Sequence, residues 1–328
     1  MSQSSPTVGP VEPTEPGEPT VKHPVVQPVE RSSEAPRSES VDTEEGIISI
    51  RAVTKAFKSH TVLQDVTFDV PRGKTTAILG PSGTGKSVLL KLIIALLKPD
   101  TGEIYVEGDR ITGVSERNVF KIRRKFGVLF QDGALFGSMN LFDNIAFPLR
   151  EHTNKTEREI RGIVLTKAEL VGLVAHLNKL PGEVSGGMRK RAGLARALVL
   201  DPKIILFDEP DSGLDPVRVA YLDDLVNTAQ HETGSTFFII THNVESVMRT
   251  ADYMGLLYRS RLVAFGNKAD MCSSTDPVVR QFLAGEAQGP IGMDEMAEGD
   301  AEARSSSRPE RHDETPAFGV PVGAARGA

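Results

Sequence analysis

Cysteine is nearly absent from this sequence, because Cys272 is the only one among 328 residues. A single thiol can form neither a disulfide within the chain nor the cysteine cluster of a zinc site, so both kinds of stabilisation are excluded. This composition fits a reducing compartment. We expect Cys272 to be a small packing residue rather than a reactive thiol.

Long hydrophobic runs are also missing. The longest one, at residues 88–97, is interrupted by Lys91 and is shorter than the roughly 20 residues needed to cross a bilayer. The first residues contain neither a basic region nor an apolar run, so we expect no signal peptide. Any role at a membrane should therefore depend on a partner.

Aromatic residues are missing from the first 45 residues, which contain eight prolines and many Glu, Ser and Thr. Residues 286–328 have a similar composition, with Phe318 as their one aromatic residue. Neither segment has enough apolar surface to offset the entropy lost on ordering, so we predict two disordered acidic tails, at 1–45 and 286–328. A single folded domain is then expected at 46–285.

The acidic charge of the chain comes from the predicted tails. The formal net charge is −6 for the whole chain, −6 for residues 1–45 and −5 for residues 286–328, which leaves +5 for residues 46–285. A mildly basic domain suits a nucleotide polyanion, but this charge is too small to indicate nucleic acid binding. Solvated tails without a specific partner are the simplest interpretation.

One glycine-rich stretch fits the phosphate-binding pattern G-x-x-x-x-G-K-[ST]. It consists of Gly80, Pro81, Ser82, Gly83, Thr84, Gly85, Lys86 and Ser87. The residues at 75–79 predict a buried strand before it, and those at 88–97 a helix after it. The backbone N–H groups of such a loop form an anion site, Lys86 would reach the β- and γ-phosphates, and the Ser87 hydroxyl would bind Mg²⁺. The alternative is a glycine-rich turn with a surface lysine, which the flanking strand and helix disfavour.

Two carboxylates and a histidine follow buried strands further along the chain. Asp208 and Glu209 end an apolar segment at 203–207, and His242 follows the apolar segment at 237–240. Ligands of open parallel sheets bind at the carboxyl ends of strands. We therefore predict that Asp208 holds Mg²⁺ through water, that Glu209 is the general base for a water nucleophile, and that His242 contacts the γ-phosphate. A solvated acidic turn and a structural histidine are the alternatives.

A helix with a basic first turn is expected from Ser185 to Leu200. Ser185 is a favourable N-cap residue, and capping alone is one interpretation of this segment. The basic residues at 189–191, however, oppose the helix dipole, which a structural cap does not explain. We therefore expect an anion at this helix start.

The segment after Gln131 is more apolar than a plain connector requires. Leu135, Phe136 and Met139 lie in a glycine-bracketed loop, and apolar residues at helical spacing follow at 141–149. Such a helical stripe is usually core. The loop before it could instead be a docking surface.

Taken in order, these motifs resemble the nucleotide-binding domain of ABC transporters over essentially all of residues 46–285. The resemblance implies an α/β fold, namely a P-loop NTPase of the ABC type. Its mixed sheet core would carry an antiparallel β part and an inserted helical subdomain at about 132–200. The resemblance also implies ATP and Mg²⁺ as cofactors and ATP hydrolysis as the activity.

The same resemblance implies a role for each motif residue. Glu209 and His242 would be catalytic, and Ser87, Gln131 and Asp208 would hold the metal. The ATP-binding residues would be Phe57, whose ring stacks on adenine, together with Gly80, Pro81, Ser82, Gly83, Thr84, Gly85, Lys86, Ser87 and Val88. The signature acting on the ATP of a partner copy would be Ser185, Gly186, Gly187 and Met188. The D-loop would be Ser212, Gly213, Leu214 and Asp215.

Residues 131–152 closely resemble the ATPases of Mce (mammalian cell entry) and Mla-type lipid transporters, and Met188 fits that group. The turn at 211–216 and the segment at 277–283 are most similar to the actinobacterial Mce ATPase. The chain departs from the usual ABC pattern at Met188, where Gln is common, and at Asn243, where Asp is common. Neither change removes a group with a direct chemical role.

These resemblances imply a head-to-tail homodimer on the cytoplasmic face of the inner membrane. An integral-membrane permease would dock at residues 131–150, Mce-type substrate-binding proteins would join indirectly, and the cargo would be lipid or sterol. No nucleic acid partner is expected. The alternatives are a soluble ABC ATPase acting on nucleic acid or ribosomes, and the ATPase of a lipoprotein or drug exporter. The single nucleotide domain, with only about 100 residues between Lys86 and Ser185, disfavours the first alternative.

Overall fold

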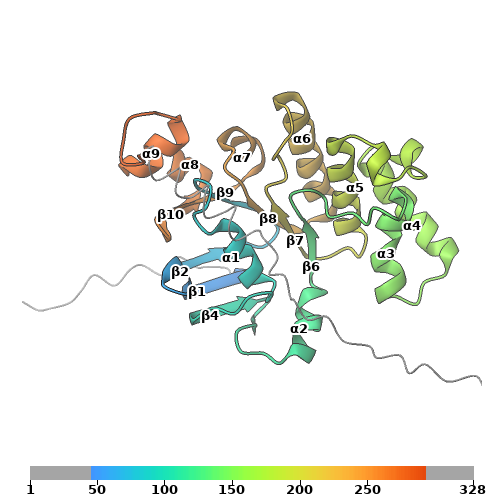
Figure 1. Ribbon diagram of the computed structural model, residues 1–328, viewed down its shortest axis with the longest axis horizontal. Coiled ribbons are helices and arrows are strands. Elements are labelled where there is room, and N and C mark those ends of the chain that lie inside the picture. The colour runs from blue at the N-terminus through green and yellow to red at the C-terminus, as the bar shows by residue number, and fades with distance from the viewer. Residues whose placement is uncertain (1–45, 293–328) are drawn as a thin grey trace, which may run out of the picture. The chain divides into compact units, whose positions relative to one another are not determined.

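The computed structural model describes residues 46–292, which fold into two sheets and their surrounding helices (Figure 1). The predicted tail at 1–45 lies outside the described residues, as does the second predicted tail from residue 293 onward. Within 46–292, no helix combines the length and the apolar character that a bilayer span requires.

The first sheet is antiparallel and has the strand order β2-β1-β4-β5. Its strands are β1 (Ile48–Phe57), β2 (His60–Val70), β4 (Thr101–Val106) and β5 (Asp109–Arg110). The second sheet has the order β10-β9-β3-β8-β7-β6, in which only the β10–β9 pair is antiparallel. Its strands are β3 (Thr75–Leu79), β6 (Phe126–Leu129), β7 (Ile204–Asp208), β8 (Thr236–Ile240), β9 (Tyr253–Tyr258) and β10 (Arg261–Asn267). The predicted mixed α/β fold with an antiparallel part is confirmed.

Helices flank the six-stranded sheet (Figure 1). They are α1 (Lys86–Ile93), α2 (Glu116–Arg123), α3 (Leu141–His152), α4 (Glu157–Leu170), α5 (Gly186–Leu198), α6 (Pro216–Thr233), α7 (Val244–Thr250), α8 (Lys268–Cys272) and α9 (Pro277–Ala284), with short 3₁₀ turns at Val174–His176 and Pro181–Glu183. In the chain, α3, α4 and α5 come between β6 and β7, in the range predicted for the inserted helical subdomain. In space, α3 and α4 lie beside α5 at one end of the domain (Figure 1). Side-chain oxygens of Asn140, Thr156 and Ser185 cap these three helices.

The six-stranded sheet divides the hydrophobic core into two clusters. Ala77 and Leu79 of β3 pack in one cluster with the apolar faces of α3, α4 and α5. Ile78 packs in the other with α1 and the antiparallel sheet. Alternate residues of a strand point to opposite faces, and helices or sheets cover both faces here, so β3 is buried along its whole length.

Three neighbouring parallel strands bring distant parts of the chain to one edge of the sheet. β3 lies beside β8, and β8 lies beside β7, all running in the same direction. The loops that follow these strands, beginning at Gly80, Glu209 and Thr241, therefore emerge at the same edge. This arrangement positions the candidate site.

The folded domain continues past its predicted end at residue 285. The side-chain amide of Gln281 donates to the carbonyl oxygen of Ile291 at 3.1 Å and accepts from the N–H of Ile291 at 2.8 Å. Ile291 is only 5% exposed. The prediction of disorder was wrong for residues 286–292, because a composition rule does not detect one apolar residue that a buried amide fixes in place.

Two further local predictions differ from the structure. The helix expected at 88–97 ends at Ile93, because Ala95 adopts a left-handed conformation with φ of 54°. Cys272 is exposed rather than packed in the interior, and its Sγ lies 3.8 Å from Sδ of Met248.

Candidate functional site

The glycine-rich stretch at residues 80–87, the P-loop, leads directly into the first turn of α1. Gly85 is the N-cap of α1 with φ of 93°, and no side chain caps the helix there. A Cβ at Gly85 would lie 2.7 Å from Cγ1 of Val62 and 2.9 Å from its carbonyl oxygen, so both space and backbone conformation require glycine. The N–H groups at this helix start are available to a phosphate.

Lys86 is the buried cation of the loop, with only 4% of its surface exposed. Its ammonium donates to the carbonyl oxygens of Gly80 and Pro81, each at 2.8 Å, and lies 3.9 Å from Oε1 of Glu209. Burial lowers the pKa of Lys86, while the nearby carboxylates oppose that shift. The ammonium is therefore held at the loop, where a bound phosphate would exchange with the carbonyl oxygens.

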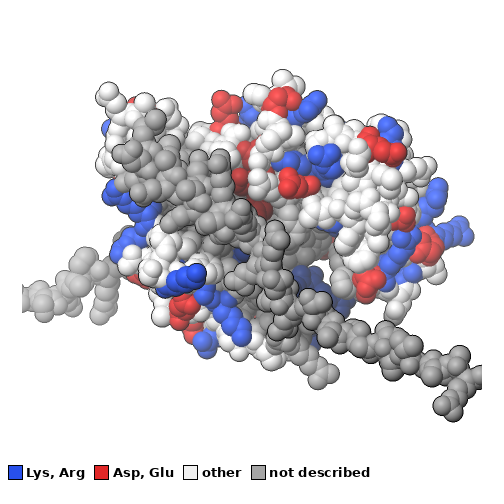
Figure 2. Space-filling view, in the orientation of Figure 1, with Lys and Arg blue, Asp and Glu red and all other residues white. Residues whose placement is uncertain are grey.

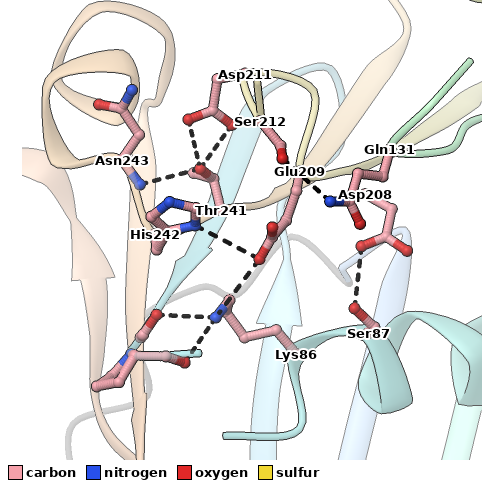
Figure 3. Close-up of polar contacts among 12 residues, drawn as sticks. Lys86, Ser87, Gln131, Asp208, Glu209, Asp211, Ser212, Thr241, His242 and Asn243 are labelled. Carbon is pink, nitrogen blue, oxygen red and sulfur yellow. Dashed lines mark hydrogen bonds and ion pairs between the residues drawn. The ribbon is translucent and has the colours of Figure 1, made fainter. Parts of the chain in front are cut away.

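Ser87 and Asp208 supply two oxygen atoms side by side. The Ser87 hydroxyl donates to Oδ1 of Asp208 at 3.1 Å (Figure 3). Burial raises the pKa of Asp208, and the Ser87 hydrogen bond acts against that rise. A hydroxyl and a carboxylate are the hard ligands that Mg²⁺ uses when it also binds substrate phosphates and water. These two residues therefore fit the magnesium ion that the sequence predicts.

Glu209 and His242 face each other across the ends of β7 and β8. Oε1 of Glu209 lies 3.6 Å from Nδ1 of His242 (Figure 3). The polar contact between the two side chains is the main cause of both pKa shifts. It lowers the pKa of Glu209 and raises the pKa of His242. An ionised carboxylate at this position can accept a proton from a water molecule.

The backbone of Glu209 adopts a conformation that is unusual for a residue with a side chain. Its φ is +46°, in the left-handed region that favours glycine. Its N–H donates to the carbonyl oxygen of Ile240 on β8 at 2.9 Å. The turn that begins here aims the carboxylate toward Lys86 and His242 (Figure 3).

Gln131 contacts the D-loop rather than the Ser87 and Asp208 pair. Its side-chain amide donates to Oγ of Ser212 at 3.1 Å. Asp215, at the other end of the D-loop, caps α6 by accepting from the N–H of Arg218. The predicted metal role of Gln131 remains a prediction.

The signature residues lie on a separate surface at the start of α5. Ser185 is the N-cap, as predicted, and its Oγ accepts from the N–H of Met188 at 3.3 Å. A groove of about 240 Å³ is lined by Ser185, Gly187, Met188, Arg191, Leu214, Val217, Arg218, Tyr221 and Leu222. Among the described residues, no hydrogen bond or ion pair joins this surface to the P-loop of the same chain. The signature residues and the P-loop are thus not in direct polar contact within the described part of one chain.

The basic turn at the start of α5 has an explanation that the sequence did not reveal. Arg189 donates to the carbonyl oxygen of Val184, and Arg191 donates to that of Val171, each at 3.0 Å. Lys190 donates to carbonyl oxygens of the D-loop. Backbone carbonyl groups therefore already accept from these cations, so the basic residues do not by themselves require an anion, and the anion expected at this helix start stays a prediction.

Phe57 lies at the end of β1, and 43% of its surface is exposed. The Lys55 ammonium lies 5.3 Å from the centre of its ring. A partly exposed ring of this kind is one on which a base could stack, and this role stays a prediction. Val88, by contrast, belongs to α1 and packs against the core cluster that contains Ile78.

Comparison with known families gives a match to the family described as "ABC transporter", over residues 63–212. The chain is similar to the "Probable ribonucleotide transport ATP-binding protein mkl" of Mycobacterium leprae (strain TN), with 57% identity over 248 residues, 76% of this chain and 72% of that protein. It is also similar to the "Intermembrane phospholipid transport system ATP-binding protein MlaF" of Escherichia coli (strain K12), with 41% identity over 245 residues, 75% of this chain and 91% of that protein.

Solved structures give the same result for the fold. The cbiO1 subunit of Clostridium perfringens, part of the ABC transporter complex cbiONQ, superimposes with a TM-score of 0.66 at 29% identity, over 73% of this chain and 94% of that chain. The "Dimeric Structure of MJ0796, a Bacterial ABC Transporter Cassette" superimposes with a TM-score of 0.63 at 28% identity, over 67% of this chain and 98% of that chain.

Proposed function

This chain belongs to the ABC transporter family, and from that premise we propose that it is the ATPase of an Mce-type lipid importer. As a member of the family it is the ATP-binding subunit of a transporter and hydrolyses ATP with Mg²⁺. The observation that carries the proposed site is the meeting of Lys86, Ser87, Asp208, Glu209 and His242 at one edge of the parallel sheet (Figure 3).

The P-loop residues bind the triphosphate in this proposal. The N–H groups at the start of α1 donate to phosphate oxygens, and Lys86 turns from the loop carbonyl groups to the β- and γ-phosphates. Ser87 and Asp208 hold Mg²⁺, which draws charge from the phosphate oxygens when it is bound. Phe57 stacks on the adenine ring.

Glu209 and His242 act on the bond that is broken. The oxygen of a water molecule forms a bond to the γ-phosphorus while the bond to the bridging oxygen of ADP breaks, and Glu209 takes the proton that the water loses. His242, whose pKa Glu209 raises, donates a ring N–H to a γ-phosphate oxygen. Removal of the water's proton and contact with the γ-phosphate are thus assigned to neighbouring side chains.

A second copy of the chain completes the site in this proposal. The signature groove at Ser185 and Met188 lies on a different surface from the P-loop, so a head-to-tail pair would place each signature against the ATP of the other copy. One relative of this fold, MJ0796, is described as dimeric in two solved structures, one of them bound to ADP and Pi. This supports the homodimer as the assembly that hydrolyses ATP.

A membrane permease docks beside the segment 131–150. The ring of Phe136 is 43% exposed in this segment. Nearby, a groove of about 560 Å³ between α2, β6, α3 and α5 is lined by Phe120, Arg123, Arg124, Phe126, Gly127, Val128, Pro148, His152, Arg196, Ala197 and Leu200. An apolar groove with a basic rim suits an amphipathic helix with acidic residues at its edge. We therefore assign the chain to the cytoplasmic face of the membrane, held there by its permease.

Lipid is the cargo favoured by the similarity to the phospholipid transport ATPase, which covers 91% of that protein. The more similar relative carries a name that refers to ribonucleotide transport instead. The likeness of residues 131–152 to Mce and Mla-type ATPases supports lipid, because these residues would meet the permease that selects the cargo. On the face shown in Figure 2, basic and acidic side chains are interspersed, so the described residues of this face offer no extended basic patch for nucleic acid.

Two experiments test this function. Phosphate release from ATP by the purified chain should vanish in Lys86→Ala together with ATP binding, whereas Lys98→Ala, an exposed lysine beyond α1, should match the unchanged chain. Tight residual ATP affinity in Lys86→Ala would count against the P-loop assignment.

Purification of the chain from native membranes, followed by mass spectrometry, tests the partners. Recovery of a permease with Mce-type chains supports the proposal, and recovery of ribosomes would overturn it. The recovered complex can then be placed in phospholipid vesicles with labelled phospholipid or labelled ribonucleotide. ATP-dependent movement of the ribonucleotide alone would exclude lipid as the cargo.

A further inference from the structure

A buried carboxylate that the proposed reaction does not use lies in the turn after the general base. Asp211 is 5% exposed and sits between Glu209 and the D-loop residue Ser212. The turn is closed by hydrogen bonds from Ser212 N to the carbonyl oxygen of Glu209 and from Leu214 N to that of Asp211, each at 3.2 Å. A buried carboxylate is costly unless its charge is compensated, so this residue has a specific reason to be there.

Thr241 connects Asp211 to the loop that carries His242. The Thr241 hydroxyl lies 2.8 Å and 3.0 Å from the two carboxylate oxygens of Asp211, to which it donates (Figure 3). The same hydroxyl accepts from the N–H of Asn243 at 3.0 Å. One side chain therefore fixes the backbone on both sides of His242, and Asp211 fixes that side chain.

Lys190 holds the same turn from the direction of the signature helix. Its ammonium donates to the carbonyl oxygens of Pro210, at 2.7 Å, and of Ser212, which are the residues before and after Asp211. Burial lowers the pKa of Lys190, and the negative charge of Asp211 is the largest of the charges that oppose this shift. The buried ammonium of α5 thus fixes the backbone on both sides of the buried carboxylate.

We propose that Asp211 is a positioning residue for ATP hydrolysis, which aligns Glu209 with His242 by pairing with Thr241 while Lys190 clamps the turn. This inference rests on the proposed function, because it gives Asp211 a part in the same reaction. Asp211 acts through Thr241 and makes no contact with the nucleotide. Misalignment of a general base slows the chemical step more than it weakens substrate binding. Loss of the pair should therefore lower kcat and leave KM for ATP nearly unchanged.

The chain contains a matched carboxylate with a purely structural setting. Asp223 is also buried, and it accepts hydrogen bonds from the hydroxyl of Ser246 at 2.6 Å and from Arg249 at 3.2 Å. These contacts join α6 to α7 and do not include the residues before and after His242. Asp223→Asn therefore controls for the general effect of neutralising a buried carboxylate.

The test compares the full chain carrying Asp211→Asn, Thr241→Val, Thr241→Ser or Asp223→Asn. Steady-state ATP hydrolysis, affinity for a fluorescent ATP analogue, and Tm are measured for each. Asp211→Asn and Thr241→Val should lower kcat about 10-fold while KM changes less than about 2-fold, and Thr241→Ser, which keeps the hydroxyl, should retain at least about half of kcat. Asp223→Asn should lower Tm and leave kcat within about 2-fold.

The double variant Asp211→Asn/Thr241→Val tests the pairing itself. Residues that act as one unit show non-additive effects, so the double variant should be no slower than the slower single variant. A kcat near that of the unchanged chain in Thr241→Val would overturn the proposal, as would additive losses in the double variant. Equal loss of kcat in Asp223→Asn would assign the effect to general destabilisation. None of these outcomes affects the proposed function, which is tested separately by the ATPase activity of the unchanged chain and of Glu209→Gln, and by the partners and cargo recovered from native membranes.

Discussion

At the scale of single residues, Glu209 combines a left-handed backbone with a carboxylate shared between a lysine and a histidine. Each feature has a cost: the backbone conformation is strained for a residue with a side chain, and the carboxylate is partly desolvated. The hydrogen bond to Ile240 and the charge of His242 offset these costs. Such an arrangement is expected where a base must be aimed at one point.

Replacement of this base gives the first prediction. Glu209→Gln keeps the shape of the side chain but cannot accept a proton, so kcat should fall by about 100-fold or more while ATP binding persists. Phosphate release measures the rate, and size-exclusion chromatography with ATP should show a trapped dimer. Glu232→Gln, at an exposed position near the end of α6, is the control. A rate close to that of the unchanged chain would exclude Glu209 as the base.

The pairing of Glu209 with His242 gives a second prediction, which concerns pH. The pKa of His242 lies above its ordinary value of 6.5 because of Glu209. The stabilisation from this pair is therefore fully present between about pH 4.5 and about pH 6.5, and it is lost as pH rises through the raised pKa of His242. At the acid end it is lost as pH falls through the lowered pKa of Glu209.

The imidazole resonances in an NMR titration of the nucleotide-free chain measure this pKa directly. His242 should titrate above 6.5 in the unchanged chain, and Glu209→Gln should move the midpoint back toward 6.5. An unchanged midpoint in the variant would show that Glu209 is not the cause.

At the scale of elements, α5 contacts both loops that flank the site. Lys190 donates to the D-loop, and Arg196 donates to the carbonyl oxygens of Gly133 and Ala134 in the segment after Gln131. Between these two contacts, Gly193 lies against β6 and Gly133. The signature helix is therefore packed directly on the segment that would meet the permease.

A pair of glycines tests this packing. A Cβ at Gly193 would lie 2.6 Å from Cδ1 of Leu129 and 3.2 Å from Cα of Gly133, whereas a Cβ at Gly162 in α4 would meet nothing within 4 Å. Gly193→Ala should cost about 1–3 kcal/mol through overpacking. Gly162→Ala should stabilise by about 0.5–1 kcal/mol through helix propensity. Urea unfolding measures both, and equal effects of the two substitutions would contradict the close contact of α5 with the loop.

Three predicted site residues that lie at one edge of the sheet share one property. Asp208 ends a short buried strand, Lys86 and His242 come after such strands, and parallel strands collect such residues at one edge. A run of apolar residues and the glycines or carboxylates that follow it are neighbours in the sequence. The P-loop and the carboxyl ends of β7 and β8 could therefore be predicted. Membership in the ABC fold is confirmed by the structural relatives.

The remaining contacts could not be predicted, because they join side chains to distant backbone groups. Lys190 and Arg191 donate to carbonyl oxygens about 20 positions away in the chain. Every residue has a backbone carbonyl group, so the sequence does not indicate which of them will accept. Asp211 was interpreted only as part of a turn, since nothing in its neighbours indicates that Thr241 lies beside it. The packing of Ile291 against Gln281 was missed for the same reason.

At the scale of the whole molecule, the end of the domain can be tested by truncation. A chain limited to 46–292 should keep ATPase activity and Tm close to those of the full chain. A chain limited to 46–285 loses the buried side chain of Ile291 and leaves the amide of Gln281 without its partners. Its free energy of unfolding should fall by about 2–4 kcal/mol, from lost burial and unpaired polar groups. Equal stability of the two truncated chains would show that the folded domain ends at residue 285. Loss of ATPase activity in the chain limited to 46–292 would show that the removed tails are required.

Because the six-stranded sheet divides the core into two clusters, substitutions in one cluster need no repacking of the other during evolution. Ala77 and Ile78 are adjacent in β3, yet they belong to different clusters. Substitutions that share no packing partner are additive in free energy, so drift among α3, α4 and α5 leaves α1 and the antiparallel sheet largely undisturbed. Descendants can thus acquire new membrane partners while they inherit the strand that carries the P-loop.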